Sequence, residues 1–172
     1  MPSSFADRRR PLLKEADVAA LTNIPLLMAE AWNRCDAEGF AAPFSRTADF
    51  IAFEGTHLSG REEIAAFHRQ IFATLVRDSR LEVTVRFVRS LRTDVAVVHS
   101  AVRVTLAGHE QPSPGRTSMQ LFTVLRRAVG WRVEAMENAR QLTLERQATL
   151  DAYDDLTHEA RHSVDTLLTV AG

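Results

Sequence analysis

The stretch that decides the fold is residues 53–68, Phe-Glu-Gly-Thr-His-Leu-Ser-Gly-Arg-Glu-Glu-Ile-Ala-Ala-Phe-His. A short strand over 48–54 ends in a glycine turn, and a second glycine then opens a helix over 61–76. Apolar residues recur at helical spacing along this helix, and His68 lies in the same stripe. The segment therefore predicts a strand, a turn and a helix whose buried face carries an imidazole.

The segments on either side predict an α+β domain. Asp17 is the expected N-cap of a helix that reaches Cys35, and Pro25 is expected to kink this helix or to make it begin near Ile24. A short second helix is expected over 36–45. Strand patterns follow at 81–91, 95–107, 117–127 and 131–138, and two of their links are short enough for hairpins. Helices first and strands after favour helices on one side of an antiparallel sheet.

Several of these strands are apolar on both faces. Residues 95–98 and 100–104 show this clearly, and so does much of 119–125. A sheet with one solvated face would alternate more cleanly between apolar and polar residues, and the helices can cover one face alone. We therefore predict a homodimer that forms through the second face of the sheet.

Composition and charge exclude several classes of partner. The chain has 172 residues, of which 45% are hydrophobic and 25% charged, and its net charge is -1. These values fit one globular domain and give no reason to expect nucleic acid or a membrane as a partner. The single cysteine, Cys35, is expected to be a buried, inert thiol. The absence of an apolar leader or membrane-length run leads us to expect a cytoplasmic protein.

Seven short motifs carry a resemblance to a known family. They are 31–36, 48–50, 55–64, 67–68, 95–99, 130–133 and Asn138. Together they resemble the nuclear transport factor 2-like superfamily and its SnoaL-like proteins, and more closely the SgcJ/EcaC branch associated with bacterial secondary metabolism. The resemblance covers about residues 17–140, and the Gly-Thr-His…Gly-Arg segment is its most specific part.

The resemblance implies a cone, in which a strongly bent antiparallel sheet wraps the helices and leaves an apolar pocket in its open mouth. It also implies a dimer that binds small apolar ligands such as polyketides. The branch is often labelled oxidoreductase, but the sequence has no Gly-x-Gly-x-x-Gly turn, cysteine pair or flavin-type motif, so we expect no cofactor. The domain is expected over 15–140, after a flexible tail over 1–14 and before a helical extension over 141–172.

Seven residues are the expected lining of the pocket. They are Trp32, Phe50, His57, His68, Phe72, His99 and Asn138. His57 and His68 are the best candidates for a proton shuttle, although a hydrogen-bonded core histidine is an equal alternative for His68. His99 faces either the pocket or the dimer interface. Asn138 can donate to a ligand or accept from it.

The known enzyme mechanisms of the superfamily are not visible in the sequence. Related ketosteroid isomerases carry their base carboxylate where this chain has Ala52, counting back from Gly55. The end of the last strand also departs from the family pattern, since it reads Met-Glu-Asn-Ala-Arg over 136–140 where relatives have Phe-Gln-Asn-Thr-Arg. This change affects the expected rim of the pocket.

A motif in the C-terminal segment matches the zinc-protease pattern His-Glu-x-x-His. It comprises His158 and His162 four residues apart, and Asp165 is a third candidate ligand. The same stripe also contains Asp155, which is typical of a solvated helix face. We therefore predict no metal site there.

The sequence favours a pocket protein for a small apolar metabolite, either polyketide-like or aromatic. The protein would bind this compound or assist its cyclisation or isomerisation. The alternative is a non-catalytic dimeric interaction module whose pocket is filled by its own side chains. An open cavity lined by the predicted residues favours the first, and a mouth closed by Tyr153 or Phe72 favours the second.

Overall fold

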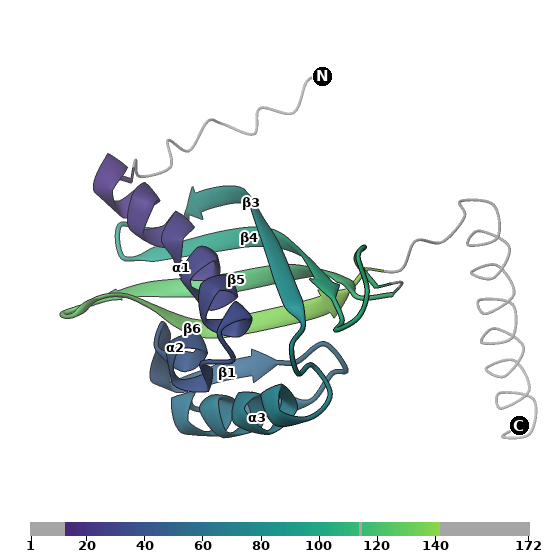
Figure 1. The fold of residues 1–172 in the computed structure, drawn as a ribbon. Helices are drawn as coiled ribbons and strands as arrows, with labels where there is room; N and C mark the ends of the chain where they lie inside the picture. Colours follow the sequence, from purple (N-terminus) through teal and green to yellow (C-terminus); the bar gives the residue numbers. More distant parts are fainter. Residues whose placement is uncertain (1–12, 114, 142–172) are drawn as a thin grey trace, which may run out of the picture. The chain divides into compact units, whose positions relative to one another are not determined.

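The computed structural model describes residues 13–113 and 115–141. Over these residues the chain forms three helices and six strands (Figure 1). In chain order they are α1 (Glu15–Asn33), α2 (Ala37–Ala41), β1 (Phe44–Ile51), β2 (His57–Ser59), α3 (Arg61–Ala73), β3 (Arg80–Ser90), β4 (Val95–Thr105), β5 (Thr117–Arg127) and β6 (Gly130–Arg140). The predicted α+β class is confirmed, and β2 is a strand that the sequence did not predict.

The six strands form one sheet in the order β2-β1-β6-β5-β4-β3. Four of the neighbouring pairs are antiparallel, as expected, but β1 and β6 run parallel. The chain crosses from β2 through α3 to the far edge, and consecutive hairpin links then return it strand by strand until β6 reaches β1. The purely antiparallel sheet of the prediction is thus corrected to a mixed one.

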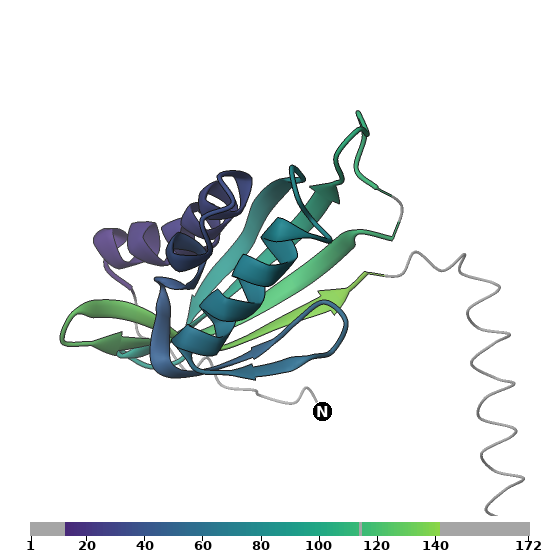
Figure 2. The ribbon, with the colours of Figure 1, turned by 60° about the horizontal axis from the view of Figure 1, so that its bottom comes forward.

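All three helices lie on one side of the sheet (Figures 1 and 2). Helix α1 packs against β3 and β4, whereas α3 packs against β1 and β2. Between helices and sheet lies a core that contains Leu21, Ile64, Phe44 and Phe122, all of which are fully buried. The amphipathic helices bury their apolar stripes here, and this burial is the main term that stabilises the fold.

Helix α1 differs from its prediction in its N-cap, and it does not begin near Ile24. It begins at Glu15, after Lys14, and runs unbroken through the buried Pro25. Asp17 is not the N-cap. It accepts a hydrogen bond from Trp131 Nε1 at 3.1 Å and pairs with Arg126. These hydrogen bonds, from Arg126 first and Trp131 second, lower the pKa of Asp17, so its carboxylate ties the start of α1 to the sheet.

Cys35 is exposed, contrary to the prediction of a buried thiol. Helix α1 ends at Asn33, and Cys35 takes a left-handed backbone conformation with φ of 54° in the turn that follows. This turn rotates the thiol away from the apolar stripe of the helix. The helical periodicity placed Cys35 on the buried face because it continued the helix two residues beyond its end at Asn33.

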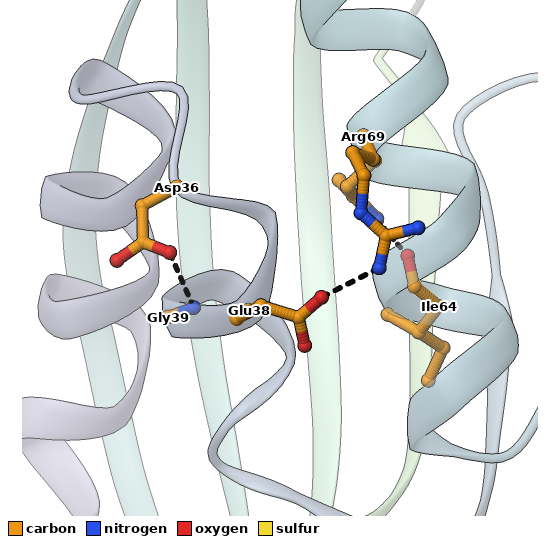
Figure 3. Close-up of polar contacts among 6 residues, drawn as sticks. Asp36, Glu38, Gly39, Ile64 and Arg69 are labelled. Atoms are coloured by element: carbon orange, nitrogen blue, oxygen red, sulfur yellow. Dashed lines mark hydrogen bonds and ion pairs between the residues drawn. The ribbon is translucent and has the colours of Figure 1, made fainter.

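Two side-chain contacts are made at the N-terminal end of helix α2 (Figure 3). The Asp36 carboxylate accepts a hydrogen bond from the backbone N–H of Gly39 at 2.8 Å, which confirms Asp36 as a cap. Glu38 pairs with Arg69 of α3 at 2.5 Å. The second of these contacts joins α2 to α3, where Phe40 lies beside the imidazole of His68.

The segment between β1 and α3 is built on two glycines with positive φ. Gly55, with φ of 87°, donates to the carbonyl of Ala52 and turns the chain from β1 into β2. Gly60, with φ of 86° and ψ of 153°, precedes α3 and donates to the carbonyl of Ala48 at 2.7 Å. Residues that carry a side chain rarely adopt this backbone conformation. The glycine at position 60 therefore sets the direction in which α3 leaves the sheet.

The expected N-terminal tail and C-terminal helical extension lie almost wholly outside the described residues. The candidate metal ligands His158, His162 and Asp165 lie outside them as well. None of the helices in 13–113 and 115–141 is both long and apolar enough to span a membrane.

Candidate functional site

A cavity of about 340 Å³ opens between α3 and the concave side of the sheet. Its wall is largely aromatic and aliphatic. The aromatic members are Trp32, Phe40, Phe50, Phe53 and Phe67, and the aliphatic ones include Ile71, Val102, Val104 and Met136. A concave, mostly apolar cavity of this size with a few polar groups is typical of a small-molecule site.

His68 lies at the centre of the aromatic cluster and is 2% exposed. Its ring stacks on Phe40 with 3.8 Å between centroids. The rings of Trp32, Phe50, Phe67 and Phe72 meet it edge-on. The imidazole therefore sits in an apolar environment and still forms part of the cavity wall.

The tautomer of His68 follows from its one hydrogen bond. Nδ1 lies 2.7 Å from the carbonyl oxygen of Ile64, and because a carbonyl accepts, Nδ1 carries the proton. Burial lowers the pKa of His68 to about 4, and the bond to Ile64 opposes this shift only in part. Near neutral pH the ring is uncharged, and Nε2 has a lone pair that can accept a hydrogen bond from a ligand.

Polar side chains from neighbouring strands form the floor of the cavity. Gln120 accepts a hydrogen bond from the buried Ser100 hydroxyl at 2.9 Å, which fixes its amide. Gln120 pairs in register with Asn138 on β6. The side-chain oxygen of Asn138 is buried and has no hydrogen-bond partner among the described residues. A buried acceptor of this kind is costly unless a ligand or water donates to it.

The mouth of the cavity carries charge. Two guanidinium groups lie over the ring of Phe53, that of Arg116 at 5.6 Å from its centroid and that of Arg140 at 4.6 Å. Arg116 also forms an ion pair with Glu54 at 3.8 Å, and its side chain is 35% exposed. The cavity thus runs from an aromatic interior to a rim where a cation is accessible.

Four of the seven predicted pocket residues line the cavity, namely Trp32, Phe50, His68 and Asn138. Phe72 lies behind the wall and packs edge-on against Trp32. The indole N–H of Trp32 donates to Ser79 Oγ at 3.0 Å, so it is engaged within the protein.

His57 and His99 lie outside the cavity, which corrects their predicted place in the pocket. Alternation along the strands explains both positions, because a strand directs successive side chains to opposite faces. Leu58 points into the core, so the exposed His57 points away and contacts Asp49 at 2.8 Å. His99 sits between the fully buried Val98 and Ser100, so it lies on the outer face, 4.8 Å from Phe87 between ring centroids.

Sequence reasoning missed a row of three polar residues in the cavity wall, Arg116, Ser118 and Gln120. A signal for them existed. These residues precede Phe122 at intervals of two, so all four share one face of the extended chain. Since Phe122 is fully buried, the polar residues in the same row also face inward.

Among residues 13–113 and 115–141, no cluster of three histidine, cysteine, aspartate or glutamate side chains is arranged to hold a metal ion. Ala52 lines the cavity, as its position in the sequence suggested, and it offers no carboxylate.

The sequence model of the SnoaL-like domain family matches residues 27–135, well over half of the chain. The chain belongs to this family. Its SnoaL-like domain resembles a solved domain of unknown function with a cystatin-like fold from Nostoc punctiforme PCC 73102. The two are 48% identical, with a TM-score of 0.77 over 91% of this chain and 97% of the other.

More distant structures share the fold of this SnoaL-like domain. A ketosteroid isomerase-like protein from Erwinia carotovora atroseptica SCRI1043 is 18% identical, with a TM-score of 0.62 over 75% of this chain and 99% of that one. An NTF-2 like protein of unknown function from Shewanella oneidensis MR-1 is 17% identical, with a TM-score of 0.57 over 72% and 97%. No curated protein matches the sequence. The SnoaL-like part of the sequence resemblance is thereby confirmed, and the distant structures show that the fold is shared.

Proposed function

We propose that this SnoaL-like domain binds a small, largely apolar molecule in the cavity between α3 and the sheet. The observation that carries the proposal is the open cavity of about 340 Å³ with an aromatic interior. Transfer of apolar ligand surface from water into such a cavity is favourable, and few polar contacts are needed to orient the ligand. The SgcJ/EcaC resemblance and the aromatic wall together favour a polyketide-like or aromatic metabolite.

The alternative of a self-filled pocket has less support. Phe72, one of the two side chains expected to close the mouth, packs on Trp32 with ring centroids 5.2 Å apart. The other, Tyr153, lies outside the described residues. The part of the chain that the structure describes leaves the cavity open.

The geometry favours binding over proton transfer. A general base works best when its pKa lies near the operating pH, and burial lowers the pKa of His68 to about 4. Its Nε2 is suited to accept a hydrogen bond and poorly suited to remove a proton from carbon. A cavity that holds a flexible molecule in a folded conformation can still assist cyclisation by positioning alone.

A matched pair of substitutions on β4 tests this binding site. Val104 lines the cavity, whereas the half-buried Val95 lies on the outer face of the same strand. We expect Val104→Phe to fill part of the cavity and to weaken binding of a neutral fluorescent naphthalene dye, N-phenyl-1-naphthylamine, by about tenfold or more. Val95→Phe should leave the affinity close to that of the wild type.

Fluorescence titration measures the affinity of the wild type and of both variants for the dye. Saturable binding that Val104→Phe alone weakens supports the cavity as the binding site. A wild-type protein that does not bind the dye, or equal effects of the two substitutions, would count against it.

We also propose that the protein forms a homodimer through the outer face of the sheet. Phe87 and Leu121 are 45% and 44% exposed there, and both lie beside His99. The Nδ1 atom of His99 is buried without a partner among the described residues, even though its ring lies on this face. A second copy would cover the two large apolar side chains and remove them from water.

Leu121→Arg should therefore shift the protein from dimer to monomer at micromolar concentration in analytical ultracentrifugation. A buried, unpaired guanidinium in the interface is strongly unfavourable. The control is Val129→Arg, in the exposed turn between β5 and β6, which should leave the dimer intact. A wild-type protein that sediments as a monomer at all concentrations would refute the proposed dimer.

A further inference from the structure

One row of inward-facing residues on β5 and just before it changes steadily in polarity from the core to the mouth of the cavity. The inner face of β5 carries every second residue, namely Phe122, Gln120 and Ser118. Arg116, which immediately precedes the strand, extends this row to the mouth. All but Arg116 are buried. At about 3.4 Å per residue, Gln120 and Arg116 are separated by roughly 14 Å along the strand direction. The row thus leads from a phenyl ring through an amide and a hydroxyl to a guanidinium.

The position of Arg116 is fixed by the backbone. Its carbonyl accepts a hydrogen bond from Val104 N–H at 3.1 Å, and its own N–H donates to Ser113. This pairing extends the β4–β5 ladder by one residue and directs the side chain to the cavity, where it forms part of the wall. An arginine fixed in this way loses less conformational entropy on binding than one in a flexible loop.

Among residues 13–113 and 115–141, the charges at the mouth do not balance. Arg116 and Arg140 supply two positive charges on Phe53, and Glu54 supplies one negative charge at 3.8 Å from Arg116, which leaves one positive charge. A separation of 3.8 Å is longer than a direct charge-assisted hydrogen bond. The Arg116 guanidinium therefore still has donors for an anion of single charge.

Deeper in the cavity, the unpartnered oxygen of Asn138 requires a donor. It lies next to Gln120 across the β5–β6 ladder, between the aromatic interior and the rim. A hydroxyl or N–H group on the body of a ligand would satisfy it. The cavity therefore presents an apolar interior, an acceptor in the middle and a cation at the mouth.

We propose that the natural ligand is an apolar ring compound that carries a carboxylate, and that Arg116 binds this carboxylate at the mouth. The ring system packs against Phe40 and Phe50, and a hydroxyl or N–H group on it donates to Asn138. This inference rests on the proposed binding function and narrows its ligand to acids. A single carboxylate matches both the single excess charge and the planar fork of one guanidinium.

A competition experiment separates this inference from the binding proposal itself. 2-Naphthoic acid and 2-naphthamide have the same ring and nearly the same shape, but near neutral pH only the acid is charged. Each displaces N-phenyl-1-naphthylamine from the wild-type protein in a fluorescence titration. We expect the acid to bind about tenfold more tightly than the amide, because a charge-assisted hydrogen bond at a partly exposed site is worth about that factor.

Two arginine variants assign this preference to one residue. Arg116→Gln should abolish the preference for the acid and leave the affinity for the amide nearly unchanged, which also shows that the variant is folded. Arg103→Gln is the matched control, since Arg103 lies on the outer face of β4 and pairs with Glu82 outside the cavity. It removes the same net charge and should preserve the preference.

Each outcome is decisive. If the dye does not bind to the wild-type protein, both the binding function and the acid preference fail. If the dye binds but the amide competes as well as the acid, the acid preference alone fails. A preference that survives in Arg116→Gln, or that Arg103→Gln abolishes equally, would also overturn the role of Arg116.

Discussion

Replacement of Gly60 with alanine is expected to lower the free energy of unfolding by about 3 kcal/mol or more. Gly60 has φ of 86° and ψ of 153°, a conformation that is essentially restricted to glycine. A Cβ atom at this position would also lie 2.8 Å from the carbonyl oxygen of Arg46. Because that atom belongs to the backbone of β1, it can move away only if the strand shifts.

Gly55 is the control position, because a side chain there would strain the backbone without contacting another atom. Its φ is 87°, but a Cβ atom there would meet nothing within 4 Å. We expect Gly55→Ala to cost about 1–2 kcal/mol, the usual penalty for a left-handed side-chain-bearing residue. Urea unfolding of both variants measures the difference. Equal costs for the two would show that the close approach of Gly60 to β1 is not what holds α3 in place.

The second large effect is a loss of stability in acid that comes from His68. Burial lowers its pKa from 6.5 to about 4 in the folded protein. Between these values the unfolded chain binds a proton that the folded chain does not bind, so stability rises with pH across the window. The His68 contribution is complete above about pH 6.5 and falls by about 3 kcal/mol as the pH approaches 4.

This pH dependence is measured by urea unfolding at several pH values. Carboxylates titrate over the same range, so the wild type must be compared with His68→Gln at each pH. The difference between their free energies of unfolding should shrink as the pH falls. His109→Gln, which removes an exposed histidine from the loop between β4 and β5, should leave the pH dependence unchanged. Parallel curves for the wild type and His68→Gln would mean that the imidazole is not buried as an uncharged ring.

The sequence predicted the elements well and the pairing of the edge strands poorly. Hydrophobic periodicity is local, so it located the start of α3 and both ends of β5 to the residue, although it extended α3 three residues too far. The parallel contact of β1 with β6 joins segments about ninety residues apart, and no local pattern encodes it. β2 has three residues, too few for a period-two pattern to stand out.

The prediction of the site was right for a residue on a helix. It was wrong for residues on strands, where alternation along the chain determines which face of the sheet a side chain occupies. His68 shares the apolar stripe of α3, and the stripe alone indicated its burial. For His57 and His99, a shift of one residue reverses the face, and both point away from the cavity. The same parity rule, applied to 116–122, would have revealed the row that ends in Arg116.

A crystal structure of the protein with 2-naphthoic acid would show whether the cavity binds an aromatic acid. We expect density for the naphthalene ring between Phe40 and the sheet, with the carboxylate directed to Arg116. An empty cavity at saturating ligand, or a ligand bound elsewhere on the surface, would contradict it.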